Sequence, residues 1–252
     1  AAAAANAGNL AIPLVKQLTQ VVKASAPEAA RYVHWGATSQ DAIDTGLMLQ
    51  LQQALQQTES RLQRLMHVLA KQVARYQHTL MAGRTWMQHA LPITYGLKLA
   101  GTLDALLRWH ERLQQMRPRV LTLQFGGAAG TLASLKEKGP QVAQALADEL
   151  NLALPDTPWH SQRDRIIELA SWYAGLCATL GKFANDFALM MQTEVAEVSE
   201  PIAEGRGGSS AMPHKRNPVS CAAILAAVFL IAFLDGGAVQ SAADEEEAGV
   251  LI

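Results

Sequence analysis

"TGLMLQLQQALQQTESRLQRLMHVLAKQVARYQ", residues 45–77, shows the helical periodicity that runs through most of this chain. Its apolar residues recur at the spacing of one helix face, and glutamine, arginine and lysine occupy the opposite face. The apolar positions are Met48, Leu51, Leu55, Leu62, Leu65, Met66, Leu69, Val73 and Tyr76. The pattern predicts one long amphipathic helix, and such a helix needs neighbours of similar length to cover its apolar face.

Two more stretches show the same periodicity, at about residues 92–116 and 163–198. Shorter helices are predicted at about residues 141–150 and from Pro218 onward, because proline favours the first position of a helix. The segment "QFGGAAGTLASL", residues 124–135, is too rich in glycine for a helix interior and is interpreted as a packed connection. No alternating pattern of useful length indicates a strand. We therefore predict an all-α protein built as an elongated bundle of long helices.

The chain is expected to consist mainly of one helical domain. Residues 1–33 are predicted to form a helical segment leading into the bundle, and residues 34–235 are predicted to form the bundle itself. The tail of residues 236–252 is left unassigned. Where the apolar faces are wider than one chain can cover, the remainder is expected to form a subunit interface.

Composition excludes several classes of function. Hydrophobic residues make up 50% of the 252 residues and charged residues 17%, which is typical of a globular protein. The formal net charge of −1 gives no overall attraction to nucleic acid or to an anionic membrane. Cys177 and Cys221 lie in apolar stretches without the spacing of a disulfide framework or a metal site. We interpret them as buried, reduced thiols in a cytoplasmic protein.

The most hydrophobic stretch, "CAAILAAVFLIAFL" at residues 221–234, raises the alternative of a membrane anchor. It is shorter than the ~18–20 apolar residues that a spanning helix needs. A buried core helix is therefore the predicted structure. The N-terminal stretch also lacks the basic segment and leucine-rich core of a secretory signal.

"HWGATSQD", residues 34–41, is the first of three polar segments that interrupt the helical pattern. Thr38, Ser39 and Asp41 are good N-terminal caps, and a capping role alone is the simpler interpretation of Asp41. His34 and the paired hydroxyls of Thr38 and Ser39 are more than a cap requires. Hydroxyls and free backbone N–H groups at a helix N-terminus can hold a carboxylate, so this segment is a candidate anion site.

The second polar segment is "GRTWMQHALP", residues 83–92, and it precedes another predicted helix. Trp86 offers a flat apolar wall. The hydrogen-bond donors clustered around it are Arg84, Thr85, Gln88 and His89. The alternative interpretation is a solvated connection with one buried tryptophan.

The third polar segment is "GGSSAMPHKRNP", residues 207–218, whose glycines and serines suit a loop. The basic run at residues 214–216 would lower the pKa of Ser209 and Ser210, which makes the two serines a candidate proton-transfer pair. Loops rich in cations are often only solvated, and that is the alternative here.

Together the three polar segments could assemble one anion-binding, proton-transferring site. The sequence has no Cys/His ligand cluster, dinucleotide fingerprint or phosphate loop, so the site is predicted to use neither a metal nor a cofactor. The expected ligand is a small anionic molecule, and no nucleic acid or membrane partner is expected.

"GSSAMPHKRNP", residues 208–218, resembles the G-S-S-x-M-P-x-K-x-N signature of the fumarase/aspartase superfamily. The other two polar segments are similar to two further regions of that superfamily and occur in the same order, so the resemblance covers about residues 33–226. It implies a central bundle of long helices, a homotetramer, and active sites each built from three subunits. Members of the superfamily also have smaller domains before and after the bundle, and this chain is expected to lack most of both.

Two positions distinguish among the branches of the superfamily. Its lyases usually carry a histidine where Trp86 stands and pair it with a glutamate where Ala222 stands. Replacing both members of that pair is electrostatically consistent, because no unpaired partner is left behind. This combination resembles the bacterial 3-carboxy-cis,cis-muconate cycloisomerases. Adenylosuccinate lyases share "SSAMPHKRNP" but should keep both the histidine and the glutamate, and they are the alternative.

The resemblance implies lactonisation of a small tricarboxylic acid, 3-carboxy-cis,cis-muconate, to 4-carboxymuconolactone in the protocatechuate branch of aromatic catabolism. Ser209 would move the proton with Lys215 beside it, and Lys215 and Asn217 would stabilise the enolate-like oxygens. His34 and His89 are the candidates for a second acid–base group. The other residues implied to bind the substrate are Thr38, Ser39, Arg84, Thr85, Trp86, Gln88, Ser210 and Met212.

An alternative of another class is a retired homologue, a helical scaffold that keeps the motifs without the activity. The signature segment argues against it, because Ser209, Lys215 and Asn217 are all present. A retired site would have no physical need for a basic loop.

Overall fold

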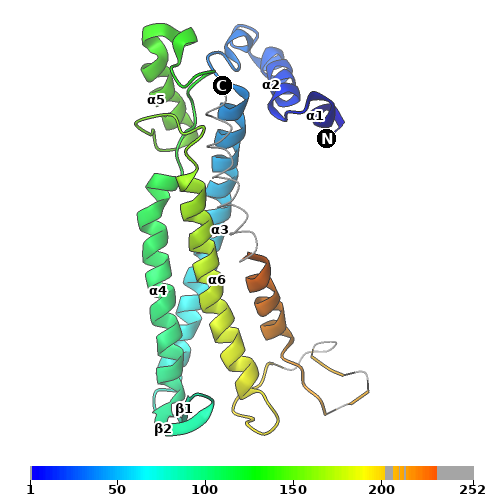
Figure 1. The fold of residues 1–252 in the computed structure, drawn as a ribbon, viewed down its shortest axis with the longest axis vertical. Coiled ribbons are helices and arrows are strands. Elements are labelled where there is room, and N and C mark those ends of the chain that lie inside the picture. Colours follow the sequence, from blue (N-terminus) through cyan, green and yellow to red (C-terminus); the bar gives the residue numbers. More distant parts are fainter. Residues whose placement is uncertain (1, 202–206, 210, 213, 232–252) are drawn as a thin grey trace. The chain divides into compact units, whose positions relative to one another are not determined.

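The computed structural model describes residues 2–201, 207–209, 211–212 and 214–231 (Figure 1). Helices dominate this part of the chain, as predicted. In chain order the elements are α1 (Ala2–Ala7), α2 (Ala11–Ser25), the 3-10 helix η1 (Ala30–Tyr32), α3 (Ser39–Arg75), β1 (Leu80–Thr85), β2 (Gln88–Thr94), α4 (Tyr95–Val120), the 3-10 helix η2 (Ala133–Lys138), α5 (Gly139–Leu150) and α6 (Asp164–Met190). Residues 219–231 form a further helix.

The chain divides into two compact units. Of the described residues, the first unit holds 2–58 and 114–165, and the second unit holds 59–113 and the residues from 166 onward. The divisions fall within α3, α4 and at the start of α6, so these helices contribute residues to both units. The predicted tail of residues 236–252 lies outside the described part of the chain.

α3 begins at Ser39 rather than at Thr45, because the polar segment before it caps the helix. Thr38 occupies the N-cap position, and its backbone N–H donates to Asp41 Oδ2 at 2.9 Å. An acidic side chain at the third helical position commonly closes a cap in this way. The capping role predicted for Asp41 is therefore confirmed.

In the first unit the glycine-rich connection packs as predicted. Gln124 and Phe125 at its start are buried, as are Leu121 and Leu123 just before it. Leu123 N–H donates to the Ala153 carbonyl oxygen at 2.8 Å, and Ala153 N–H donates to the Leu121 carbonyl oxygen at 2.9 Å. Gly127 has a φ of 71°, and a Cβ there would lie 2.8 Å from the carbonyl oxygen of Gly36. The connection therefore passes close to the loop before α3, at a point where only glycine fits.

In the second unit two tryptophans connect α4 and α6. Trp109 Nε1 donates to Thr179 Oγ1 at 2.8 Å, and Trp172 Nε1 donates to the Trp109 carbonyl oxygen at 3.0 Å. A Cβ at Gly175 would lie 2.1 Å from the Trp109 ring, so the glycine admits the indole against α6. Buried leucines of α3, α4 and α6 extend this core, and they are Leu62, Leu69, Leu99, Leu106, Leu169 and Leu176.

The later long helices differ from their predicted bounds. α4 begins later than predicted, at Tyr95, because the residues before it form a strand, and it continues through Pro118 to Val120. α6 ends earlier than predicted, at Met190. The chain turns after that residue, and Ala196 takes a left-handed backbone conformation with a φ of 50°.

Residues 80–94 form a β-hairpin, so the expectation that the chain contains no strand is wrong for this segment. Most side chains of the two strands taken together are exposed, and for this reason no alternation of apolar and polar residues marks the strands. The turn residues Trp86 and Met87 have φ values of 52° and 59°, as in the tight turns that suit the twist of a hairpin. A Cβ at Gly83 would lie 2.4 Å from the Leu91 carbonyl oxygen, so glycine is required where the pairing is irregular.

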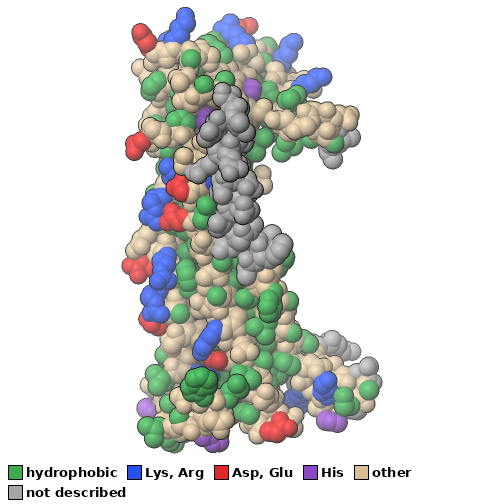
Figure 2. Space-filling model, viewed as in Figure 1, with side chains coloured by type: hydrophobic (Ala, Val, Ile, Leu, Met, Phe, Trp, Pro, Cys, Tyr) green, Lys and Arg blue, Asp and Glu red, His purple; other side chains and the backbone are tan. Residues whose placement is uncertain are grey.

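The helix of residues 219–231 is not a core helix within one chain. Cys221 is buried, but Phe229 and Leu230 are 80% and 60% exposed. Figure 2 shows hydrophobic side chains at the surface over this helix and α6. Among the described residues, the prediction of a buried core helix is therefore wrong for residues 221–231, and residues 232–234 of the predicted stretch lie outside the described part of the chain. Among the described residues, no helix combines the length and the apolar character needed to span a membrane.

Candidate functional site

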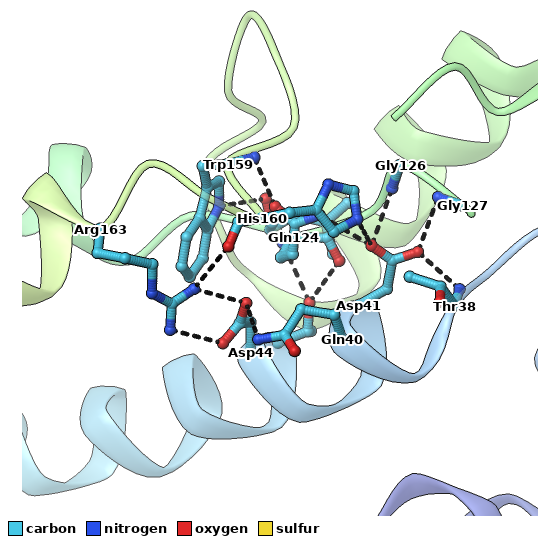
Figure 3. Close-up of polar contacts among 12 residues, drawn as sticks. Thr38, Gln40, Asp41, Asp44, Gln124, Gly126, Gly127, Trp159, His160 and Arg163 are labelled. Atoms are coloured by element: carbon cyan, nitrogen blue, oxygen red, sulfur yellow. Dashed lines mark hydrogen bonds and ion pairs between the residues drawn. The ribbon is translucent and has the colours of Figure 1, made fainter. Parts of the chain in front are cut away.

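The carboxylate of Asp41, in the first turn of α3, is the centre of a buried polar network in the first unit (Figure 3). The residue is only 2% exposed. Its Oδ2 accepts hydrogen bonds from the backbone N–H groups of Thr38 and Gly127, at 2.9 and 2.8 Å. Its Oδ1 accepts hydrogen bonds from Gln124 Nε2 at 2.8 Å and from Gly126 N–H at 3.0 Å. One side chain thus fixes the loop before α3 against the glycine-rich connection.

His160 brings a third segment to the same carboxylate. Its Nε2 lies 3.0 Å from Asp41 Oδ1, an ion-pair distance for a protonated imidazole, although the two groups lack the alignment of a hydrogen bond. A Cβ at Gly126 would lie 2.6 Å from His160 Cε1, so the glycine makes room for the ring. The preceding residue, Trp159, holds this segment in place through its N–H, which donates to Gln124 Oε1 at 2.6 Å.

A buried ion pair between Asp44 and Arg163 extends the network along α3. The guanidinium donates to the two carboxylate oxygens at 2.8 and 3.0 Å. Gln40 Nε2 also donates to Asp44 Oδ2 at 2.9 Å. Such a pair is expensive to break, because either partner alone would be a buried, uncompensated charge. Among the described residues, no group of three or more His, Cys, Asp or Glu side chains is placed to hold a metal ion.

Thr38 contacts this network through its backbone N–H, and His34, Thr38 and Ser39 are all half-buried. Within the described part of the chain, no hydrogen bond uses the hydroxyl of Thr38 or Ser39, so both are available to a ligand at the N-terminus of α3. His34 lies in the loop before α3 and has a φ of 63°. The structure therefore places the three residues predicted in this segment at one end of one helix.

The β-hairpin of the second unit arranges the four predicted donors in two facing pairs. Arg84 lies opposite His89, and Thr85 lies opposite Gln88. Directly opposed residues of antiparallel strands project from the same face, whereas consecutive residues project from opposite faces. Arg84 and His89 therefore share one face, and Thr85 and Gln88 share the other. The segment precedes a helix, α4, as predicted, and a hairpin that was not predicted arranges its donors.

Arg84 already holds a carboxylate in this structure. Its guanidinium forms a bidentate ion pair with Glu197, with distances of 2.8 and 2.9 Å. The hydrogen bonds from Arg84 outweigh partial burial and hold the pKa of Glu197 below its ordinary value. A substrate carboxylate at Arg84 would have to displace Glu197, so the substrate-binding role of Arg84 stays a prediction.

Trp86 lies at the tip of the hairpin and is 96% exposed. Both it and the neighbouring Met87 are held at positive φ, a conformation that costs about 1–2 kcal/mol for a residue with a side chain. The described residues therefore leave the Trp86 ring almost completely uncovered. Its predicted role of shaping a pocket and excluding water requires a partner surface.

Ser209 lies in the signature segment with backbone donors directed at its oxygen. Its Oγ accepts hydrogen bonds from Met212 N–H at 3.2 Å and from Ala211 N–H at 3.4 Å. Two such donors favour negative charge on that oxygen. The predicted partner Lys215 is exposed, and among the described residues its Nζ makes no hydrogen bond or ion pair. Ser210, also predicted to bind the substrate, lies outside the described residues.

Asn217 closes the signature loop. Its backbone N–H donates to the Gly207 carbonyl oxygen at 2.8 Å, and its Nδ2 donates to the Gly208 carbonyl oxygen at 3.3 Å. Gly207 has a φ of 71°, which glycine adopts without strain. The side-chain amide of Asn217 therefore has a long, exposed hydrogen bond that a ligand oxygen could replace.

A cavity of about 1720 Å³ in the second unit adjoins the signature loop. Its walls carry basic and phenolic side chains, including Arg75, Tyr76 and Tyr95, and burial raises the pKa of Tyr95. The space is large enough for a small organic acid. Of the residues predicted in the second unit, those that line it are Met212, Lys215 and Asn217, and those that do not are Arg84, Thr85, Trp86, Gln88, His89 and Ser209.

Comparison with known protein families gives a match over residues 6–232 to the family described as Lyase. The chain belongs to this lyase family. The resemblance of the signature segment to the fumarase/aspartase superfamily is thereby confirmed. The match includes all three polar segments.

Two relatives of this lyase-family chain share much of its sequence. The 3-carboxy-cis,cis-muconate cycloisomerase of Pseudomonas aeruginosa is 60% identical over 227 residues, which cover 90% of this chain and 50% of that protein. The protein of the same name from Acinetobacter baylyi is 50% identical over 241 residues, which cover 96% of this chain and 53% of that protein. The chain thus spans about half the length of the curated relatives it matches.

Solved structures agree with the lyase-family fold. The 3-carboxy-cis,cis-muconate lactonizing enzyme from Pseudomonas putida matches with a TM-score of 0.84 and 52% identity, over 93% of this chain and 51% of that one. The β-carboxy-cis,cis-muconate cycloisomerase from Acinetobacter calcoaceticus sp. ADP1 matches with a TM-score of 0.86 and 45% identity, over 96% of this chain and 53% of that one. The predicted fold class, a helical bundle of the fumarase/aspartase type, is therefore confirmed.

Sequence reasoning missed the residues that hold the site in place. His160 and Arg163 belong to a polar run, "WHSQRD" at residues 159–164, which ends at the first residue of α6 and could have been singled out as a fourth polar segment. Glu197 gives no comparable signal, because nothing in its neighbourhood indicates a partner more than a hundred residues away. Long-range partners of this kind are visible only in the fold.

Glu200 of this lyase-family chain caps the helix that follows the signature loop. Its carboxylate accepts hydrogen bonds from Ser220 N–H at 3.0 Å, Ser220 Oγ at 2.8 Å and Cys221 N–H at 3.2 Å. Partial burial raises the pKa of Glu200, but the hydrogen bonds from Ser220 and Cys221 outweigh it and hold the pKa below the ordinary value of 4.5. The negative charge also suits the positive end of the helix dipole.

Acid is expected to loosen the start of the 219–231 helix. Because folding lowers the pKa of Glu200, its stabilisation is fully present above about pH 4.5 and is lost as the pH falls through the lowered folded value. Hydrogen exchange corrected for its intrinsic pH dependence should show about a fivefold loss of protection at the helix start between about pH 6 and pH 3. The uncharged variant Glu200→Gln should lack this loss, and an equal acid response in the variant would contradict the assignment.

Proposed function

We propose that the protein acts as a 3-carboxy-cis,cis-muconate cycloisomerase, which lactonises a tricarboxylic diene to 4-carboxymuconolactone. One carboxylate oxygen of the substrate forms a bond to a carbon of a double bond. The π electrons move onto the neighbouring carboxylate as an enolate-like species, and a proton then adds to carbon. No electrons are gained or lost, and the nucleophile belongs to the substrate, so the protein must fold the substrate, stabilise the developing charge and deliver one proton.

The main observation behind this proposal is that the sequence has both Trp86 and Ala222 together with a complete signature segment. In the reverse reaction the departing group is a carboxylate with a pKa of about 4, so it leaves as an anion without an acid to protonate it. Cleavage of adenylosuccinate expels an amine and needs such an acid, which the resemblance assigns to a histidine and a glutamate at these two positions. The 60% identity to the Pseudomonas aeruginosa cycloisomerase supports the same choice.

Ser209 takes the proton-transfer role in the proposal. The Ser209 hydroxyl gives its proton to the substrate carbon, and the two backbone N–H groups on its Oγ stabilise the alkoxide that is left. Lys215 adds positive charge from the same loop and, with the amide of Asn217, is proposed to hold the enolate-like oxygens. The exposed position of Lys215 leaves its ammonium group available to a bound anion.

The remaining carboxylates of the substrate are proposed to bind the hydroxyl and amide donors of the other two polar segments. Thr38 and Ser39 offer hydroxyls at the N-terminus of α3, where the helix dipole favours an anion. Thr85 and Gln88 share one face of the hairpin and can donate to one ligand. These positions follow the resemblance residue by residue.

We further propose a homotetramer in which each active site combines residues of three subunits, as the resemblance implies. Trp86 is almost fully exposed on its hairpin, and a tryptophan excludes water only when another surface covers it. Phe229 and Leu230 also expose their side chains on the helix after the signature loop. Unpartnered apolar side chains of this size support burial against other copies of the chain.

We place the reaction in the cytoplasm. Cys177 and Cys221 are both free thiols, and burial raises the pKa of each. Unpaired, unreactive thiols fit a reducing compartment.

The purified protein is expected to consume 3-carboxy-cis,cis-muconate. Lactonisation shortens the conjugated system, so loss of the diene absorbance follows the reaction directly. Adenylosuccinate is the matched control substrate, and its absorbance should not change. Cleavage of adenylosuccinate would instead favour the elimination alternative, and a folded protein that leaves both compounds untouched would favour the retired homologue.

A further inference from the structure

We infer that His160 is a carboxylate-binding residue of the proposed active site and that Asp41 positions its imidazole ring. The inference rests on the proposed function, because it adds a group that holds the tricarboxylic substrate. His160 precedes α6 in the first unit, in the segment that packs beside the glycine-rich connection. The residue lies outside the three polar segments and outside the signature motif.

Asp41 joins His160 to the predicted carboxylate site through its two oxygens. Oδ2 accepts the hydrogen bond from Thr38 N–H at 2.9 Å, while Oδ1 lies 3.0 Å from His160 Nε2. The backbone N–H groups of Gly126 and Gly127 donate to the same two oxygens, so the glycine-rich connection is also fixed to this carboxylate. Because the carboxylate is buried, separating the segments would strip a buried charge of its partners. The loop before α3 and the His160 ring are therefore fixed to the same carboxylate, one at each of its oxygens.

The orientation of the ring leaves one nitrogen for a ligand. Nε2 is buried against Asp41, and Figure 3 shows the second ring nitrogen, Nδ1, on the side away from that carboxylate. The His160 side chain is nevertheless 27% exposed, so its accessible part lies away from Nε2. A protonated imidazole donates from both nitrogens and can therefore pair with Asp41 and with a substrate carboxylate at the same time.

The negative charge of the proposed substrate calls for a positively charged hydrogen-bond donor at this position. Three carboxylates must be held, and Thr38 and Ser39 offer only neutral hydroxyls. Arg163, the arginine of the network, already uses its guanidinium in a bidentate ion pair with Asp44. His160 can add a charge-assisted hydrogen bond at this end of α3, which is about twice as strong as a neutral one.

Two substitutions of His160 separate ligand binding from a structural role. His160→Gln places an amide donor near the Nε2 position, so it keeps the contact with Asp41 and loses the outward donor. His160→Asn places the amide near the Nδ1 position, so it keeps an outward donor and loses the contact with Asp41. Each variant thus keeps one function of the ring and loses the other: His160→Gln keeps the contact with Asp41, and His160→Asn keeps the outward donor.

Binding is measured by calorimetry with propane-1,2,3-tricarboxylate, a saturated probe that cannot react. His160→Gln should weaken binding by about 10–100-fold, and His160→Asn by less than about tenfold. In turnover of 3-carboxy-cis,cis-muconate, His160→Gln should raise KM by a similar factor with kcat within about threefold, because uniform binding is lost. The matched control is His67→Gln, the same change at an exposed histidine of α3, which should bind the probe as the wild type does.

A structural role predicts the opposite order, with His160→Gln close to wild type and His160→Asn impaired. That order, equal affinity in all the variants, or a wild-type protein that does not bind the probe would each overturn the inference. If the wild type binds the probe and the variants fall in the expected order, but 3-carboxy-cis,cis-muconate is not converted, the proposed function fails and the assignment of His160 stands.

Discussion

Ser209→Ala is expected to lower kcat for lactonisation by about 10²–10⁴-fold, because the variant has no side-chain group that can exchange a proton with the substrate carbon. The wild-type oxygen accepts hydrogen bonds from Met212 N–H and Ala211 N–H, and these stabilise the alkoxide form. Single-turnover loss of the diene absorbance measures the chemical step directly. KM should change much less than kcat, because the proposed proton transfer takes place in the transition state.

Alanine also removes the acceptor that shapes this turn, so a second variant is needed. Asparagine can accept the same backbone N–H groups but has no hydroxyl to transfer a proton. Ser209→Asn should therefore be as inactive as Ser209→Ala if proton transfer is the role of the serine. Recovery of activity in Ser209→Asn would show that Ser209 only shapes the loop. Ser60→Ala, at an exposed position on α3, is the matched control and should behave as wild type.

Asp41→Ala is expected to lower the free energy of unfolding by about 3–5 kcal/mol, the range found when one partner of a buried charged network is removed. The substitution leaves the N–H groups of Thr38, Gly126 and Gly127 and the amide of Gln124 without their acceptor. Urea denaturation at a fixed protein concentration measures the change, because assembly would otherwise contribute to the apparent stability.

A loss this large can prevent folding altogether, since domains are stable by only about 5–15 kcal/mol. Asp41→Asn keeps one acceptor oxygen and should cost about 1–3 kcal/mol, which stays measurable. Asp104→Ala is the matched control, because Asp104 pairs with Arg108 on the exposed face of α4 and should contribute less than about 1 kcal/mol. Equal losses for Asp41→Ala and Asp104→Ala would refute the central role of Asp41.

The helices were predictable because their signal is local and repetitive. Apolar residues at one spacing predict α3, and the body of α6 follows the same rule. The hairpin of residues 80–94 was not predictable in this way, because most of its side chains face solvent and leave no alternating pattern in the sequence. For the helix of residues 219–231 the sequence predicted the helix correctly but not its exposure. Its composition indicates burial, but the described residues leave Phe229 largely exposed.

The residues of the candidate site could also be predicted only in part from the sequence. The residue types in the signature segment are enough to identify the superfamily and to indicate the chemistry of Ser209 and Lys215. They give no partner for Arg84, which pairs with Glu197. They also give no indication that Asp41, an apparent helix cap, holds His160 from a distant loop.

The sequence by itself determined which segments are helical, which family the chain belongs to and which side chains can carry charge or move a proton, because each depends on residues close together in the chain. Only the tertiary structure decided which carboxylate each cation pairs with and which carboxylate accepts a hydrogen bond from each buried N–H group. That choice depends on the free energy of burying a polar group, which is favourable only when a partner from elsewhere in the chain arrives at hydrogen-bonding distance. Asp41 shows the difference: its sequence context predicts one hydrogen bond, and the fold supplies three more and a histidine.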